Sequence, residues 1–576
     1  MNNKKRDIEV KNENYFAIAS IIFLLFVLMM TITNLNYYIR KSKENLNMEA
    51  KNTIPVLEEG KKVELNQTCL IVAGEDKNNS LGIVEESLEK AKIGYNSKTK
   101  FEDITDKELN SAEIIIINGS EFSSLGNVEM VYEYLKKDKH IIFTSMPDAH
   151  FVETSKLHEI MGIKNITKFK NQEGVKFLSG FMLGGLLEFP ELSYDAPNIE
   201  LLSTTKIYAT GFKDSPLIWR NIFDESEIYV VNGQFFETNA GFGILSAIMA
   251  QIYPDYIYPV VNAKVFTYMG LPYVSDENTS EIEEIYSRNT MQLQQDILIP
   301  DILSINKSRK FIPNGFFTDS FNKDNRKKID GFNANQINNY GKDIYKLNGE
   351  VGMVYSGDLE KDIEIYHNLF SKNFESLYLN EEDVETLNEA ISKDKFSFIE
   401  SVFGPWTSKN KSFGYLNKSS VYIPFTIDGV PNADSQKLEF YAGVTAFGTI
   451  IQNLNFKQII YPEDDRDNWM NVSREYIKFI DSYREKFQMI EERNISDTAQ
   501  VVKKFEINSP SIEYFNNKIE IRLEEWYGEA YFILRTNKAI TSINEGTIEK
   551  IEEGAYLVTA KNKKVDINLG QIDRYK

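Results

Sequence analysis

Aromatic and acidic side chains follow several apolar runs in the second half of the chain, where they could bind a sugar. Aromatic faces stack on sugar rings, and carboxylates accept hydrogen bonds from hydroxyl groups or pair with the cations of amino sugars. Ordinary loops and interfaces use the same residue types, so each residue also has a purely structural interpretation. The candidates for a glycan cleft are Tyr268, Asp319, Trp406, Asp428, Asp464 and Asp465.

Three of these acids allow a second kind of chemistry. A glycosidase uses two carboxylates, one as an acid and the other as a base or nucleophile. Asp428 in "FTIDGV" could form such a pair with Asp464 or Asp465 in "YPEDDRD". Neighbouring carboxylates are also common on protein surfaces, so a carbohydrate-processing enzyme stands as the alternative to a binding protein.

Histidine and cysteine, which supply many metal sites and nucleophiles, are scarce. The four histidines are His140, His150, His158 and His367, and no two have the His-x-x-x-His spacing of a metal site. The one cysteine, Cys69, opens the apolar run "CLIVAG", where a buried thiol usually acts as a small hydrophobic residue. These patterns predict no metal, no cofactor and no cysteine nucleophile.

The composition indicates a folded, acidic chain of several domains. Hydrophobic residues make up 42% and charged residues 26% of the 576 residues, which suits globular domains of about 100–200 residues each. The formal net charge is −20. Because phosphate binding requires a basic face, we expect no nucleic-acid partner.

The candidate residues lie in a region, residues 257–502, where strand-like and helical segments alternate. Its strand-like runs include "GFFTDSF", "GEVGMVYSGD", "SVYIPFTIDG" and "FKQIIYPEDD". An alternation of this length predicts a (β/α) barrel, whole or partial. Active sites of such barrels lie at the carboxyl ends of the strands, so we place the candidate residues there.

Three segments of this region resemble the motifs of NodB-like polysaccharide deacetylases. In "TYMGLPY" the hydrophobic residue and proline of the first motif are kept, but Met269 and Gly270 stand where the family has its two aspartates. "NGEVGMVYSGD" keeps the second motif, with Val354 and Tyr355 near the expected first histidine. "IIYPEDD" keeps the proline of the His-Pro strand, with Tyr461 in place of the histidine.

The resemblance implies a barrel that has kept its frame and lost its catalyst. In working members of the family a divalent metal activates water, a carboxylate takes the proton and a histidine returns one to the leaving amine. Here the residues for each of these roles are replaced. We therefore expect a degenerate deacetylase-like barrel with no catalytic residue.

Residues 63–256 have a different pattern, typical of a doubly wound α/β domain. Short apolar runs such as "CLIVAG", "AEIIIING" and "HIIFTS" alternate with amphipathic segments, which predicts a parallel sheet with helices on both faces. The layout resembles amidotransferase-like and flavodoxin-like domains. It has no Gly-x-Cys-x-Gly turn and no Gly-x-Gly-x-x-Gly loop, so we expect recognition or packing rather than catalysis.

Residues 503–576 alternate between apolar and polar side chains. "KIEIRLEEW", "YFILRT", "AYLVTA" and "KVDINL" each have a period of two, with turns between them. Short antiparallel strands of this kind predict a small β-sandwich.

The amino-terminal segment predicts a membrane anchor. Residues 16–35 carry no charge and are long enough to cross a bilayer core of about 30 Å. We interpret residues 1–15 as a cytoplasmic tail, 16–35 as a single transmembrane helix and 36–62 as a polar stalk. Basic residues flank both sides of the anchor, so charge alone leaves its orientation open.

The order of these parts resembles a membrane-anchored bacterial family of unknown function that is associated with Pel-type exopolysaccharide clusters. That resemblance implies an extracytoplasmic location, a polysaccharide ligand and partners among other membrane subunits of such a system. Two interpretations of the function follow from it. The chain is a pseudoenzyme that binds glycan, or it is a protein-only scaffold in the cell envelope.

Overall fold

The structure is a computed structural model that describes residues 67–572, except 75–78, 120, 128, 138, 323–330, 381–383 and 408–411. The predicted tail, anchor and stalk lie outside the described residues. Within the part of the chain that is described, no helix is both long and apolar enough to cross a membrane.

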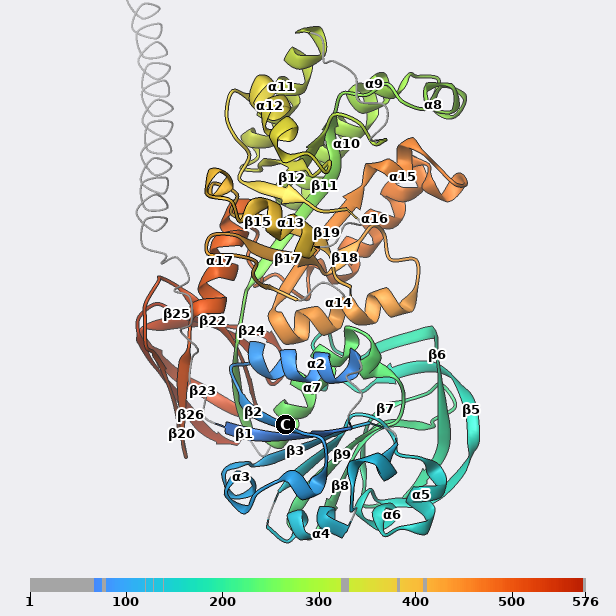
Figure 1. Cartoon of the computed structure of the whole chain (residues 1–576), viewed down its shortest axis with the longest axis vertical. Helices are drawn as coiled ribbons and strands as arrows, with labels where there is room; N and C mark the ends of the chain where they lie inside the picture. The colour runs from blue at the N-terminus through green and yellow to red at the C-terminus, as the bar shows by residue number, and fades with distance from the viewer. Residues whose placement is uncertain are drawn as a thin grey trace, which may run out of the picture. The chain divides into compact units, whose positions relative to one another are not determined.

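The first domain is built on a nine-stranded sheet with the strand order β2-β1-β3-β4-β9-β8-β7-β5-β6 (Figure 1). Its first five strands are parallel, as the alternation of strands and helices predicts. They are β1 (Gln67–Ala73), β2 (Gly94–Lys98), β3 (Ile114–Asn118), β4 (His140–Phe143) and β9 (Ser226–Val231).

Helices cover both faces of this parallel half. Alternate residues of β3 enter two separate cores, with Ile114 and Ile116 on one face and Ile115 and Ile117 on the other. The run of four isoleucines is therefore explained by burial on both sides of the sheet. The helices are α2 (Asn79–Lys90), α3 (Asp106–Ser111), α4 (Glu129–Leu135), α5 (Ala149–Thr154), α6 (Leu157–Ile160) and α7 (Ala240–Ile252).

The other half of the sheet is antiparallel, which differs from the prediction of a parallel sheet. Its long hairpin has no helix between its two strands, so the chain can only return in the antiparallel direction. The four strands are β5 (Ile163–Phe177), β6 (Leu187–Leu201), β7 (Lys206–Thr210) and β8 (Pro216–Phe223). The predicted mixed α/β class is confirmed, with this antiparallel extension added.

The second domain is a barrel of parallel strands. The run from Val421 to Asp428 pairs with β15 through its first half and with β19 through its second half, and so joins the two edges of the sheet. The barrel strands are β11 (Ala263–Tyr273), β12 (Pro313–Thr318), β13 (Val351–Val354), β14 (Ser376–Tyr378), β15 (Ser401–Pro405), β17 (Val421–Phe425), β18 (Ile427–Asp428) and β19 (Thr449–Asn455). The short β16 (Gly414–Tyr415) adds to β17 in the antiparallel direction.

Helices surround the barrel, and one of them connects it to the first domain. Helix α14 packs on α7 so closely that a Cβ atom on Gly243 would lie 2.4 Å from the Cα of Ala442. The barrel helices are α8 (Thr279–Tyr286), α9 (Thr290–Leu293), α10 (Ile299–Arg309), α11 (Gly331–Lys346), α12 (Leu359–Phe370), α13 (Val384–Ile391), α14 (Asp434–Phe447), α15 (Phe456–Ile460), α16 (Trp469–Arg484) and α17 (Ile495–Ile507).

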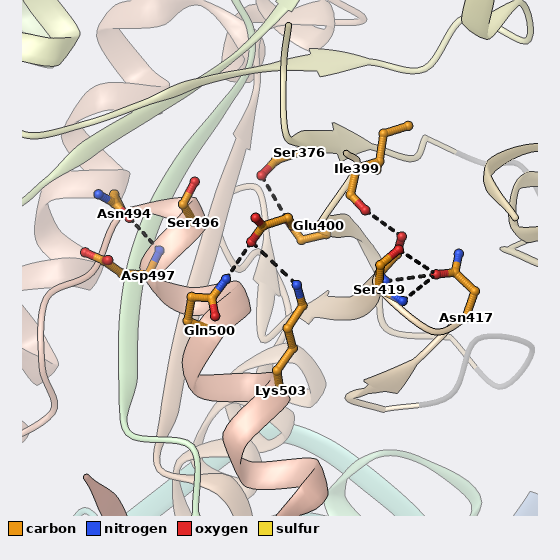
Figure 2. A network of polar contacts seen from close by, with 12 residues as sticks. Ser376, Ile399, Glu400, Asn417, Ser419, Asn494, Ser496, Asp497, Gln500 and Lys503 are labelled. Carbon is orange, nitrogen blue, oxygen red and sulfur yellow. Dashed lines mark hydrogen bonds and ion pairs between the residues drawn. The ribbon is translucent and has the colours of Figure 1, made fainter. Parts of the chain in front are cut away.

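Helix α17 covers the amino end of the barrel (Figure 2). Glu400, just before β15, accepts hydrogen bonds from Gln500 at 2.6 Å and Lys503 at 3.5 Å. Glu350, just before β13, accepts one from the backbone N–H of Ser496 at 2.9 Å. These contacts close the amino end, so a ligand site in the barrel would have to lie at the carboxyl end.

Two four-stranded antiparallel sheets form the carboxyl-terminal sandwich, with Ile519, Phe532 and Ile567 in its core. One sheet is β20 (Pro510–Phe515), β21 (Lys518–Leu523), β26 (Lys564–Ile572) and β23 (Lys538–Asn544), and the other is β10 (Asp255–Val260), β22 (Ala530–Thr536), β25 (Ala555–Ala560) and β24 (Gly546–Glu552). Strand β10 precedes the barrel in sequence and pairs with β22, so the sandwich draws one strand from a distant part of the chain.

Candidate functional site

The carboxyl end of β11 is where the deacetylase resemblance expects two aspartates. Met269 is buried there at 3% exposure. Gly270 has φ +78°, and a Cβ atom on it would lie 2.3 Å from the ring of Phe321. This backbone favours glycine, so the position cannot hold an aspartate without strain. No cluster of three metal-binding side chains occurs among the residues that the structure describes.

Tyr461, at the position where the deacetylase resemblance expects a histidine, belongs to a hydrogen-bonded group. Its hydroxyl donates to Oε2 of Glu277 at 2.9 Å, and the hydroxyl of Ser320 donates to Oε1 of the same carboxylate. Burial and Glu277 together raise the pKa of Tyr461 to about 12. The phenol is therefore a neutral donor, and the carboxylate of Glu277 joins three loops at the carboxyl end.

The interior of the barrel is filled by its own side chains. Phe316, Tyr378, Phe403 and Phe425 form a chain of ring contacts with centroids 5.4–6.3 Å apart. Asn453 accepts a hydrogen bond from Thr267 at 3.0 Å and donates to Asp428 at 2.6 Å and to Tyr378 at 3.4 Å. Asn453 thus links three other polar groups of the barrel.

Tyr268, predicted to line the glycan cleft, is instead a core residue with 0% exposure. Its hydroxyl accepts a hydrogen bond from Asn306 of α10 at 2.6 Å and lies 3.2 Å from the hydroxyl of Tyr476 of α16. Side chains alternate across a strand, and this one points outward to the helices rather than toward the barrel mouth. It has no face available for a sugar.

Trp406, also predicted for the cleft, lies between the barrel and the first domain. Its ring is 5.4 Å from that of Phe242 in α7 and 5.9 Å from that of Phe447 in α14. Its backbone carbonyl accepts a hydrogen bond from Asn239 at 3.1 Å. These contacts are those of a tryptophan packed at an interface between two domains.

The four predicted acids do not form one cluster of contacts. Asp319 is buried at 3% exposure, whereas Asp465 is exposed. Asp464 pairs with Arg466 at 2.5 Å, which lowers its pKa. Asp428 reaches solvent, yet the surrounding protein desolvates its carboxylate and raises its pKa, against the opposing effect of the bond from Asn453.

A large cleft lies in the first domain, at the carboxyl ends of β3, β4 and β9 and the amino end of α2. Its volume is about 1130 Å³, slightly above the usual range for small-molecule sites. Parallel sheets of this type bind ligands at the carboxyl ends of their strands. Sequence reasoning did not select this cleft, although "IIIING", "FTSMPD" and "VVNGQ" mark the three strand ends that build it.

The floor of the cleft is held by one buried amide. Asn118, at the end of β3, accepts hydrogen bonds from the hydroxyls of Ser80 and Thr144, each at 2.7 Å. Ser80 begins α2 and Thr144 follows β4, and both line the cleft. The amide thereby fixes two hydroxyl groups that a ligand can reach.

Two polar atoms beside this floor have no hydrogen-bond partner among the described residues. Asn232 is 0% exposed, and its Nδ2 donates to the carbonyls of Pro197 and Pro216, both at 3.0 Å. Those carbonyls can only accept, so the orientation of the amide is fixed and its Oδ1 is the atom left without a partner. The Oγ of Ser145, after β4, is the second such atom.

Comparison with known proteins finds a match to one family model and a shared fold with one solved structure. The family described as an uncharacterised protein conserved in bacteria (DUF2194) matches residues 375–557, from the residue before β14 into β25. None of the curated proteins matches the chain. The crystal structure of Agd3, a novel carbohydrate deacetylase, is similar over 88% of this chain and 99% of its own, at 9% identity and a TM-score of 0.50. That likeness shows a shared fold.

Two further solved structures are similar to parts of the chain. A putative glycoside hydrolase/deacetylase from Parabacteroides distasonis covers 48% of this chain and 82% of its own, at 10% identity and a TM-score of 0.29. A glutamine amidotransferase from Thermotoga maritima covers 33% of this chain and 84% of its own, at 11% identity and a TM-score of 0.23.

Proposed function

We propose that this chain is a membrane-anchored, extracytoplasmic protein that binds polysaccharide without deacetylating it. The proposal rests on the residues found at the carboxyl end of the barrel. The fold is shared with a carbohydrate deacetylase. Met269, Gly270 and Tyr461 stand where the sequence resemblance to NodB-like deacetylases expects reactive residues. Binding requires a cleft but not a catalyst, and a cleft is present in the first domain.

The test is carried out on the full-length chain, purified in a mild detergent. We expect no stoichiometric divalent metal, no acetate release from acetylated amino-sugar oligomers, and saturable binding of such oligomers or their deacetylated forms by calorimetry. One equivalent of zinc together with acetate release would overturn the absence of catalysis. No binding of any oligomer at millimolar concentration would overturn the glycan-binding function.

Location is part of the proposal and rests on the uncharged segment 16–35. We expect protease added to intact cells, after removal of the cell wall, to digest the chain beyond residue 40. A cytoplasmic protein digested only after lysis is the control. Full protection of the chain in intact cells would contradict an extracytoplasmic location.

A second candidate function is glycoside hydrolysis by carboxylates of the barrel. One observation favours it: burial raises the pKa of Asp428, which is the direction that a general acid requires. Assay of the chain on amino-sugar polymers, beside the double variant Asp428→Asn/Asp464→Asn, tests it. Cleavage by the wild type alone would establish the enzyme.

The partners we propose are other membrane subunits of an exopolysaccharide system, of the Pel type or a related one. Co-purification from membranes after mild crosslinking would identify them. If such subunits are captured and no glycan binds, the protein-only scaffold becomes the better description.

A further inference from the structure

We infer that the cleft of the first domain is a binding site for amino sugars whose amines are free and positively charged. The inference rests on the proposed function, and it adds the place of binding and the charge of the ligand. Three properties of the cleft carry it: acceptor groups without partners, an excess of carboxylates, and apolar surface beside them.

The first property is the pair of unpartnered polar atoms. The Oδ1 of Asn232 accepts no hydrogen bond from the described part of the chain, and an acceptor left unpaired in the interior lowers stability. A ligand that donates hydrogen bonds would satisfy it. The Oγ of Ser145 can donate or accept, as can the hydroxyls of Ser80 and Thr144. A polyol is the kind of molecule that supplies donors and acceptors at this density.

The second property is charge. Four carboxylates line the cleft, from Glu121, Asp148, Asp195 and Glu237, and none of the described lining residues is a lysine or arginine. None of the four forms an ion pair with another described residue. An anionic or phosphorylated ligand would therefore be repelled. An ammonium group would be attracted, and it also donates the hydrogen bonds that carboxylates accept.

The third property is apolar surface. The half-buried ring of Phe151 lies tilted against the buried ring of Phe122 at a centroid distance of 5.7 Å, and both line the cleft. Such a surface suits the apolar face of a sugar ring, whereas a polyamine or an inorganic cation has no ring face to pack against it. Together the three properties select a sugar that carries a cation.

None of the described residues that line the cleft is an activated nucleophile, which favours binding over turnover. Ser145 carries the hydroxyl that most resembles a nucleophile. Its activation would require a hydrogen bond to a base such as His150 in the same cleft. Its Oγ makes none with the residues that the structure describes. The ligand would thus bind and dissociate without being chemically converted.

The main test is a charge-neutral cleft. The variant Glu121→Gln/Asp148→Asn/Asp195→Asn/Glu237→Gln keeps the shape of each side chain, and Asn can replace Asp148 as the cap of α5. The control Glu364→Gln/Glu389→Gln/Glu524→Gln/Glu549→Gln removes the same charge from exposed positions outside the cleft. The probes are the β-1,4-linked glucosamine hexamer and its fully N-acetylated counterpart.

We expect the full-length wild type and the control to bind the glucosamine hexamer more tightly than the acetylated one. The cleft variant should lose about tenfold or more in affinity for the glucosamine hexamer, since four modest ion pairs are removed. Equal affinity of wild type and cleft variant would overturn the inference while leaving glycan binding elsewhere intact. Binding of putrescine as tightly as the hexamer would overturn the sugar part alone.

A second variant separates a ligand contact from a structural role. Ser145→Ala removes a hydroxyl that has no protein partner, so the midpoint of thermal unfolding should stay the same or rise. Affinity for the glucosamine hexamer should fall about three- to tenfold if the hydroxyl contacts the ligand. A lower unfolding midpoint with unchanged affinity would assign Ser145 to the fold and count against the cleft.

Discussion

The carboxyl end of the barrel and the cleft of the first domain occupy equivalent places in their folds, yet the buried amides at the two places differ in whether all their polar groups are hydrogen-bonded. In the barrel, Asn453 bonds to Thr267, Tyr378 and Asp428, and Tyr461 bonds to Glu277. In the cleft, Asn232 and Ser145 each present an atom that no described residue satisfies.

The difference indicates which of the two sites a ligand would stabilise more. Buried polar groups are nearly always hydrogen-bonded, so a site that satisfies itself gains little from a ligand, whereas unpaired acceptors gain a great deal. Substitutions in the barrel should therefore change stability more than binding. Substitutions in the cleft should do the reverse.

The largest effect is expected from Tyr268→Ala in the barrel. It removes a fully buried ring and the acceptor for Asn306, so the free energy of unfolding should fall by about 3–5 kcal/mol in urea titrations. Tyr268→Phe, which keeps the ring, should lose less. A stable Tyr268→Ala protein that no longer binds sugar would break the comparison and return Tyr268 to a binding site.

A smaller loss of stability is expected when aspartates are placed at the two positions where the deacetylase resemblance expects them. The variant Met269→Asp/Gly270→Asp buries charge, and position 270 has φ +78° with the ring of Phe321 against it. The free energy of unfolding should therefore be about 2–4 kcal/mol lower than in the wild type. Adding Tyr461→His should not produce zinc binding. Stoichiometric zinc in the triple variant, measured by elemental analysis, would show that the frame is still competent.

The pH dependence of stability should come partly from the closed end of the barrel. Burial raises the pKa of Glu492 to about 7, although Lys264, 3.1 Å away, opposes the shift. The folded state therefore holds this proton more tightly than the unfolded state does. Stability should fall, by no more than about 3 kcal/mol, as pH rises from the usual range of a glutamate through 7.

Glu492→Gln mimics the protonated acid and should flatten this dependence in urea titrations at pH 5 and pH 8. The charge-neutral cleft variant is the matched control and should keep the wild-type slope. An unchanged slope in Glu492→Gln would assign the dependence to other groups.

The smallest effect is expected from Tyr461→Phe. It removes one hydrogen bond to Glu277 from a half-buried group, which should lower stability by about 1 kcal/mol. Affinity for amino-sugar oligomers should not change, because the residue lies in the barrel and not in the cleft. A loss of affinity with normal stability would move binding to the barrel mouth.

Sequence alone was a good guide wherever burial repeats along a single element. The isoleucines of β3, the alternating strands of the sandwich and the order of the barrel strands all follow from short-range periodicity, which secondary structure imposes directly. Met269, Gly270 and Tyr461 are likewise read from the chain, and their side chains carry no carboxylate or imidazole in any fold.

What the tertiary structure decided concerns side chains whose partners are distant in sequence. Tyr268 and Trp406 have the chemistry of sugar contacts, but α10 and α16 cover the first and α7 packs against the second, and neither contact leaves a local signal. The pairing of β10 with β22 joins segments far apart in the chain. The cleft itself exists only because β3, β4 and β9 end side by side, which places Asn118, Ser145 and Asn232 together. Periodicity reports whether a residue is buried, whereas only the assembled sheet determines what it is buried against, and that decides whether its polar atoms are satisfied.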